Sequence, residues 1–308
     1  ISEQELGGSK THSEVSGVGD GEFENDAACI AAVKKYLSFF PSSCEEQPPV
    51  LPVTDAIDRR DEALLDLIPE STRKPYDMYK LIKTIVDHGD ILDIKPRFAR
   101  TVITCFARIG GRSVGIVANQ PMHLGGILDI DSSDKAARFI QICDAFNIPL
   151  VFLQDVPGFM IGSKVEHAGI IRHGAKLLHV MSAATVPKIT VVIRKAYGAG
   201  YYVMCGRAYE PDLIVSWPSG EISVMGAEGM VGIAARKLFG PGEPPPEMKK
   251  MITEQIQKHI DIYKVAGWGL IDDVIDPRDT RKVVAWGLEL ARKKVVERPH
   301  RKRGVIPV

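Results

Sequence analysis

Residues 186–204 read VPKITVVIRKAYGAGYYVM, and this stretch decides the expected fold. The β-branched run at 189–193 predicts a buried strand, which a small-residue turn and a helix from about Gly200 follow. Because Gly198 and Gly200 lack a Cβ, a ligand can approach the main chain where the first helical N–H groups have no partners. This arrangement favours an oxyanion-binding site. The same small residues are also typical of a helix packed tightly on a sheet, so the motif alone leaves both interpretations open.

A second strand, loop and helix with the same plan precede this stretch. Residues 149–154 predict a buried strand, residues 155–162 a loop, and a helix is expected from about Glu166. Two β-branched runs at 101–106 and 113–119 flank a glycine turn and predict a β-hairpin. Strands that alternate with helices are typical of a parallel sheet with right-handed crossovers, so the sequence predicts the α/β class.

The crossover after the hairpin is expected to be an amphipathic helix over residues 133–147. Its apolar face is predicted to carry Ala136, Ala137, Phe139, Ile140, Cys143 and Phe146. Its polar face is predicted to carry Lys135, Arg138 and Gln141. Further helices are expected at residues 77–87, 227–238, 248–266 and 277–292, and short strands at residues 212–217 and 221–225.

The first 60 residues are less regular than the rest. Residues 6–20 are rich in Gly and Ser and predict a loop, and residues 25–40 predict a helix with Asp26 as its N-cap. The apolar positions of that helix are Ala28, Ile30, Val33 and Leu37. Residues 44–49, which end in two prolines, and the polar stretch that continues to Arg60 predict an extended linker. We therefore expect a domain boundary here, between residues 1–50 and residues 51–308.

Composition limits the classes of function. The 308 residues are 45% hydrophobic and 25% charged, as in an ordinary globular protein, and their 39 basic and 39 acidic residues give no field that favours nucleic acid. No apolar run reaches the roughly 20 residues that span a bilayer. The five cysteines lack Cys-x-x-Cys spacing and predict a reducing compartment, so the cytoplasm is the expected location, or the mitochondrial matrix in a eukaryote.

No side-chain constellation points to metal or triad chemistry. None of the eight histidines has His-x-x-x-His spacing, so we expect no metal site. Ser163 lies near His167 in the sequence, but a Gly-x-Ser-x-Gly elbow and an acid partner are missing, so serine hydrolysis is not expected.

The chain carries further motifs, which are DVPGF at residues 155–159, GIIRHGAK at 169–176, ATVPKIT at 184–190 and RKAYG at 194–198. Together they resemble the carboxyltransferase (β) subunit of biotin-dependent acyl-CoA carboxylases, the family of the propionyl-, acetyl- and methylcrotonyl-CoA carboxylases. The resemblance covers the whole chain and implies a crotonase-like ββα spiral fold. It also implies that the chain holds the C-terminal half of such a subunit and the end of the N-terminal half.

The resemblance implies an enzyme that transfers a carboxyl group from carboxybiotin to the α carbon of a short acyl-CoA. In this chemistry biotin supplies its own base, and backbone N–H groups stabilise the enolates. The family's second oxyanion hole falls on Ala199 and Gly200, where it would hold the ureido oxygen of biotin. Gly158 and Phe159 fall on the wall of the biotin pocket, and Gly198 lies at the same cofactor-binding turn. The first hole, for the thioester, is expected outside this chain.

The identity of the acyl group stays open. Tyr202 falls on the position that shapes the acyl pocket in the propionyl branch, although an aromatic residue after a glycine turn also commonly packs in the core. Residues 194–197 resemble the propionyl and acetyl branch, whereas residues 159–162 and 204–209 resemble the methylcrotonyl branch. Propionyl-CoA is the expected substrate because of residues 194–197.

Charged residues after the second strand have two interpretations each. Glu166 is either an acid that stabilises a helix N-terminus by about 0.3–1 kcal/mol or a part of the site. Lys164 and Arg172 are either solvated or in contact with the phosphates of CoA.

The resemblance further implies work with a biotin carboxylase and a biotin carboxyl carrier protein, in a homo-oligomer that is expected to be a hexamer of two stacked trimers. We expect no nucleic-acid and no membrane partner. Two alternatives remain, which are a biotin-dependent acyl-CoA decarboxylase of the sodium-pump type and a non-catalytic module for assembly or carrier docking.

Overall fold

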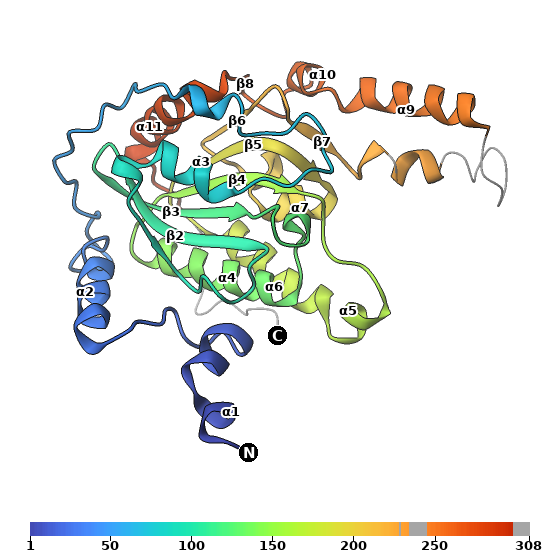
Figure 1. The fold of residues 1–308 in the computed structure, drawn as a ribbon. Coiled ribbons are helices and arrows are strands. Elements are labelled where there is room, and N and C mark those ends of the chain that lie inside the picture. The colour runs from blue at the N-terminus through green and yellow to red at the C-terminus, as the bar shows by residue number, and fades with distance from the viewer. Residues whose placement is uncertain (228, 234–244, 298–308) are drawn as a thin grey trace.

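The computed structural model describes residues 1–227, 229–233 and 245–297, and one eight-stranded sheet lies at its centre (Figure 1). The strands are β1 (Ile91–Asp93), β2 (Val102–Ile109), β3 (Arg112–Asn119), β4 (Leu150–Val156), β5 (Lys188–Tyr197), β6 (Leu213–Ser216), β7 (Glu221–Ser223) and β8 (Asp273–Val274). Their order is β1-β2-β3-β4-β5-β6-β8, and β7 pairs with the end of β5. The first three strands pair antiparallel and every later pair is parallel.

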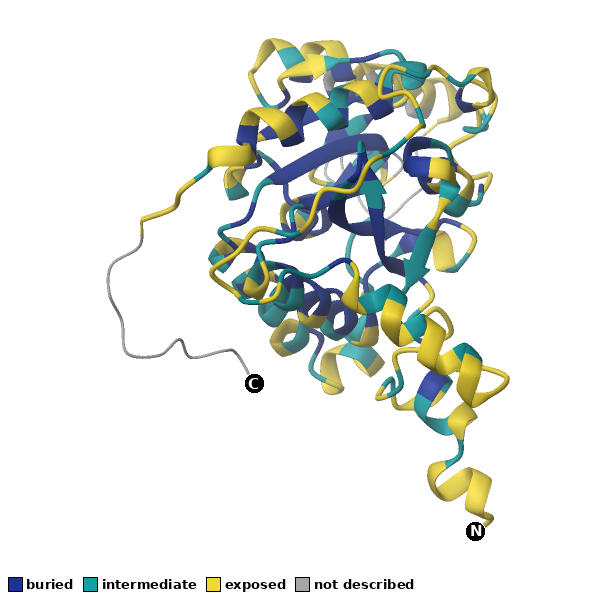
Figure 2. Ribbon diagram, turned by 90° about the vertical axis from the view of Figure 1, so that its left-hand side faces the viewer, coloured by how far each residue is buried: buried dark blue, intermediate teal, exposed yellow. Residues whose placement is uncertain are grey.

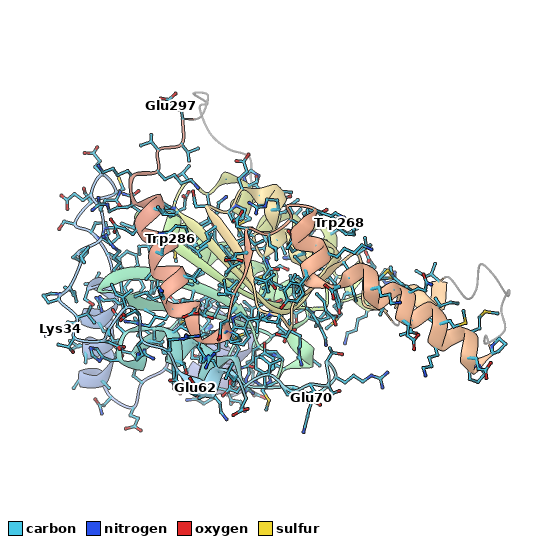
Figure 3. The ribbon with its side chains drawn as sticks, turned by 90° about the horizontal axis from the view of Figure 1, so that it is seen from above. Lys34, Glu62, Glu70, Trp268, Trp286 and Glu297 are labelled. Atoms are coloured by element: carbon cyan, nitrogen blue, oxygen red, sulfur yellow. The ribbon has the colours of Figure 1, made fainter. Side chains whose placement is uncertain are left out.

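Helices cover both faces of this sheet. The α-helices with defined bounds are α1 (Glu3–Gly7), α2 (Asp26–Leu37), α3 (Met78–Ile85), α4 (Ile130–Ala145), α5 (Ser163–His167), α6 (Ile170–Ala183), α7 (Gly198–Val203), α9 (Pro246–Ile260), α10 (Ile262–Gly267) and α11 (Thr280–Leu290), of which only some lie on the sheet. Helices α4 and α6 cover one face, and α3 and α11 cover the other. Helix α9 extends away from the body of the molecule (Figures 1 and 3).

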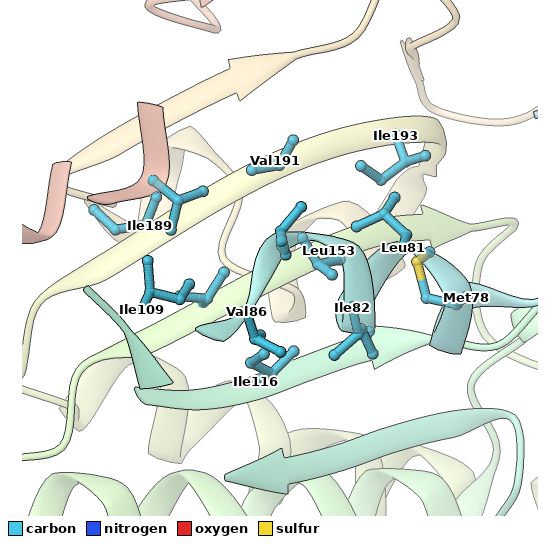
Figure 4. Close-up of a cluster of buried hydrophobic side chains, with 14 of the residues drawn as sticks. Met78, Leu81, Ile82, Val86, Ile109, Ile116, Leu153, Ile189, Val191 and Ile193 are labelled. Atoms are coloured by element: carbon cyan, nitrogen blue, oxygen red, sulfur yellow. The ribbon is translucent and has the colours of Figure 1, made fainter. Parts of the chain in front are cut away.

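The sheet lies between two hydrophobic layers, because successive side chains of each strand point to opposite faces. In β4, Val151 and Leu153 enter the layer under α3 and α11, where β5 adds Val191 (Figure 4). Leu150 and Phe152 enter the layer that contains α4 and α6. Both layers bury the central strands of the sheet, which are dark blue in Figure 2.

The elements predicted for the sheet are confirmed. The hairpin is β2 and β3, the crossover helix is α4, and the two buried strands are β4 and β5. The α/β class is confirmed with them. Of the helix predicted at residues 227–238, the described residues 227 and 229–233 are helical, and the rest lies outside the described residues.

The prediction that Lys135 lies on the polar face of α4 is wrong, because only 4% of this residue is exposed. Its Nζ donates to the carbonyl oxygens of Phe98 at 2.8 Å and Val102 at 2.7 Å. Burial lowers the pKa of Lys135 to about 7. Phe146, predicted to point inward, follows the end of α4, is 36% exposed and packs edge-on against Phe40.

The N-terminal predictions need correction. The N-cap of α2 is Asn25 rather than Asp26, since the Asn25 side chain accepts the amide hydrogen of Ala28 at 2.9 Å. The predicted apolar face of α2 is exposed, with Ile30 at 55% and Leu37 at 60%. Phe39, just beyond the helix, is instead fully buried.

Two further segments differ from the predictions. The loop predicted at residues 6–20 contains the end of α1 and a π-helical turn at Thr11–Val15. The single helix predicted at residues 248–266 is divided into α9 and α10, because Asp261 leaves the helical conformation and caps α10 with its carboxylate.

Candidate active site

The candidate site lies where β5 passes into α7. Gly198 begins this helix with a φ of 54°. A Cβ on Gly198 would lie 2.8 Å from the carbonyl oxygen of Val224, so glycine is required at this turn. The strand, turn and helix predicted from residues 186–204 are therefore confirmed.

Helix α7 presents its first amide groups at the carboxyl end of the sheet. Ala199 is exposed, Gly200 is buried, and no side chain caps this N-terminus. Since the first amides of a helix have no partner within it, those of Ala199 and Gly200 are the candidate donors to an oxyanion.

The loop after β4 lies against α7. An ideal Cβ on Gly200 would be 2.7 Å from Cγ2 of Val156 and 3.1 Å from Cα of Gly158. Gly158 has a φ of 129°, and the one atom near its own ideal Cβ is the carbonyl oxygen of Tyr197 at 4.0 Å. The structure thus brings Gly158, Gly198 and Gly200 together and leaves open space beside Gly158.

Phe159 and the backbone around it fix this loop. An ideal Cβ on Gly174 of α6 would be 3.0 Å from Cε1 of Phe159, so the ring packs where the helix has no side chain. The amide of Leu128 donates to the carbonyl of Gly158 at 3.0 Å, and the amide of Met160 donates back to the carbonyl of Leu128 at 2.7 Å. The loop is therefore held from both sides and forms a defined wall of the site.

Tyr202 of α7 is not a core residue, because 45% of it is exposed. The interpretation of Tyr202 as plain core is therefore wrong. Its ring centroid lies 5.6 Å from that of Tyr201 and 6.3 Å from that of Tyr209. These neighbours place an aromatic surface at the outer end of α7.

Asp155 and Arg194 form a buried ion pair beneath the site, which the motifs did not reveal. Oδ2 of Asp155 lies 3.0 Å from both Nε and Nη2 of Arg194, and the two side chains are 0% and 3% exposed. The signal in the sequence is a pair of opposite charges near the ends of neighbouring apolar strands, where an unpaired charge would be costly. Their partnership depends on the strand register, which the sequence alone does not give.

Tyr197 and Glu221 are joined at the other side of the turn. The hydroxyl of Tyr197 donates to a carboxylate oxygen of Glu221. Burial and then this hydrogen bond raise the pKa of Tyr197, so the phenol stays protonated and ties β5 to β7. Arg194 and Glu221 also line a cleft of about 530 Å³.

Other charged candidates lie at the surface. Glu166, Lys164 and Arg172 are exposed, as are Ser163 and His167 of the short helix α5. In the described ranges no group of three or more His, Cys, Asp or Glu residues is placed to hold a metal ion. Among the helices that the structure describes, none combines the length and the apolar character needed to cross a membrane.

The chain is similar to known proteins over its whole length. The family model described as the carboxyl transferase domain matches residues 1–306. The propionyl-CoA carboxylase beta chain of Roseobacter denitrificans is 44% identical over 308 residues, which make up 100% of this chain and 60% of the relative. The methylmalonyl-CoA decarboxylase subunit alpha of Propionigenium modestum is 41% identical over 309 residues, with the same shares. This chain thus spans about 60% of the length of these curated relatives.

A solved structure is similar over the whole chain. The crystal structure of transcarboxylase 12S, with methylmalonyl-coenzyme A and methylmalonic acid bound, has a TM-score of 0.95 and 45% identity, and the match covers 100% of this chain and 59% of that chain. This similarity confirms the crotonase-like fold that the sequence resemblance implied.

Proposed function

Because this chain belongs to the carboxyl transferase domain family, we propose that it is the part of a biotin-dependent acyl-CoA carboxyltransferase that transfers the carboxyl group to the α carbon of a short acyl-CoA. The observation that carries the proposal is the convergence of Gly158, Gly198 and Gly200 on the uncapped first turn of α7. Since the chain spans about 60% of its relatives, the remaining groups of the site are expected outside it.

The residues present fit the ureido ring of biotin. Open space beside Gly158 admits a flat group, and the amides of Ala199 and Gly200 are the donors that would hold its oxygen. Phe159, fixed against α6, would close the pocket on the side of the loop. When bound, biotin supplies the carboxyl group and the base for the α proton of the thioester.

This chain contributes position and charge stabilisation to the reaction. The amides of α7 point at the place where negative charge develops, and the surrounding backbone holds them there in advance, so no reorganisation is needed. The absence of a side-chain base among Gly158, Phe159, Ala199 and Gly200 is consistent with a reaction in which the cofactor removes the proton.

Decarboxylation of an acyl-CoA is a second candidate. The 41% identity to a methylmalonyl-CoA decarboxylase subunit favours it. The same backbone donors serve carboxyl transfer in either direction, because both directions pass through the same charged states.

We infer that the chain works with a biotin carboxylase and a biotin carboxyl carrier protein, and that it assembles as a hexamer. The transcarboxylase 12S structure is described as a hexamer assembly. Large apolar side chains near the proposed site are exposed, with Ile161 at 88% and Ile171 at 76%. Such exposed residues favour coverage by another protein surface.

The proposed function is tested by assaying short acyl-CoA carboxylation with the intact enzyme, its carrier and its carboxylase. Transfer should require the carrier and stop when avidin sequesters its biotin, because in the proposed reaction the cofactor supplies both the carboxyl group and the base. Avidin saturated with free biotin beforehand serves as the control and should leave the rate unchanged. Carboxylation that survives avidin would contradict the proposal.

Tyr202 should influence which acyl group is accepted. If its exposed ring borders the acyl pocket, Tyr202→Ile and Tyr202→Asp should change the ratios of kcat/KM among acetyl-, propionyl-, butyryl- and methylcrotonyl-CoA by about tenfold, since one methylene is discriminated by about 1–3 kcal/mol. Tyr209→Ile, in the neighbouring aromatic residue, is the matched control. A uniform change across the four thioesters would remove Tyr202 from the pocket. We propose propionyl-CoA as the preferred substrate of the unchanged protein.

A further inference from the structure

Strand β5 carries two additional residues beside β4 just before the candidate site. The parallel pairing is regular up to Gln154 opposite Val192 and resumes with Val156 opposite Ala196. Strand β4 therefore advances by two residues where β5 advances by four. An irregularity of this kind shifts everything that follows it, so it determines where α7 lies relative to the loop after β4.

The side chain of Asp155 lies within this irregularity. Its Oδ1 accepts the amide hydrogen of Lys195 at 3.1 Å, and its Oδ2 accepts from Nε of Arg194 at 3.0 Å. Both Lys195 and Arg194 belong to the additional segment of β5. A charged carboxylate with almost no access to water thus fastens the irregular part of β5 to β4.

Arg194 is fixed on its other side as well. Its Nη1 donates to the carbonyl oxygen of Lys74 at 2.9 Å, and the guanidinium lies over the ring of Tyr76, 5.0 Å from its centroid. A guanidinium bound in this way has few other positions, so the carboxylate of Asp155 is also held in one place.

We propose that Asp155 is a positioning residue for the oxyanion-binding turn: through Arg194 and the amide of Lys195, it sets the distance between α7 and the loop after β4. Helix α7 and the loop after β4 are closely packed at this point, since an ideal Cβ on Gly200 would lie 3.1 Å from Cα of Gly158. This inference rests on the proposed function, and it adds a residue that does not touch the bound groups.

The test compares Asp155→Asn with Asp87→Asn in the intact enzyme. Asp87 is a matched control because it also pairs with a buried arginine, Arg281 at 2.7 Å, and accepts backbone amides, but at the opposite end of the sheet beside the turn before β3. Both variants should lower Tm. Only Asp155→Asn should lower kcat, by about a hundredfold for a displaced site, while KM for the acyl-CoA stays unchanged.

Amide hydrogen exchange supplies a readout that needs no activity. Asp155→Asn should accelerate exchange in residues 196–203 about tenfold, whereas Asp87→Asn should not. Unchanged exchange and kcat in folded Asp155→Asn, or equal losses of kcat in both variants, would overturn the positioning role.

If Asp155→Asn does not fold, Arg194→Lys takes its place, because lysine keeps the charge but loses the contact through two nitrogens. If the enzyme without any substitution shows no biotin-dependent transfer, the proposed function is overturned instead. Amide hydrogen exchange would still decide whether Asp155 positions α7.

Discussion

Gly200→Val is expected to lower kcat for carboxyl transfer by about a hundredfold or more, the cost of losing one oxyanion donor. Its Cβ alone would lie 2.7 Å from Cγ2 of Val156 and 3.1 Å from Cα of Gly158. The two extra methyl groups of valine make the overlap worse, so α7 and the loop after β4 must separate. The amide of residue 200 then leaves the position where it would face the ureido oxygen.

The measurement is kcat with the carrier saturating, beside Tm and the oligomeric state of the variant. Gly267→Val is the control, because Gly267 is an exposed glycine of α10 whose ideal Cβ meets nothing within 4 Å. It should leave kcat unchanged. Ala199→Val adds bulk on the exposed side of the same turn and is also expected to obstruct the bound group. Rates near normal in folded Gly200→Val would mean that the oxyanion-binding turn lies elsewhere.

The layers of the fold could be predicted because strand and helix periods are local properties. The β-branched run in β5 and the apolar run in β4 specify buried strands whatever their neighbours are. Gly198 was predicted at a turn for the same reason, since its φ of 54° is a property of a single residue.

Contacts between distant segments could not be predicted in this way. Lys135 has the spacing of an exposed residue, but the carbonyls of Phe98 and Val102 give its ammonium a buried partner. The pairing of Asp155 with Arg194 depends on a register change in β5 that no local pattern reveals. The candidate site was therefore predicted as a backbone turn, and the charges that support it were not.

In α2 the local pattern was predicted, but the surroundings of its apolar face were not. Its helical period was interpreted correctly, but Ile30 and Leu37 are exposed in this chain. The spacing of apolar residues in a helix identifies which side chains share a face, but it does not identify what covers that face. Since this face of α2 is exposed, we propose that residues 1–50 belong to one domain and that a second unit begins near residue 51.

Arg281→Met is expected to lower the free energy of unfolding by about 3–5 kcal/mol, the cost of removing one partner of a buried ion pair. Arg281 is 1% exposed, and its Nη2 lies 2.7 Å from Oδ1 of Asp87. Its Nε donates to the carbonyl of Ala56 at 2.9 Å, and its Nη1 donates to that of Ile85 at the same distance. Methionine fills part of the space but leaves the buried carboxylate of Asp87 without its cationic partner and two carbonyls without their donor.

The same variant also removes a contact with the segment predicted to be a linker, because Ala56 lies there. Urea unfolding at neutral pH gives the free energy, and Arg278→Met is the matched control, since Arg278 pairs with Asp276 and Glu62 nearer the surface and should matter much less. The kcat of Arg281→Met should stay normal, because Arg281 contacts the end of the sheet opposite α7. An effect no larger than that of Arg278→Met would contradict the stabilising role of the buried Arg281 contacts, whereas a large loss of stability with normal kcat would support it.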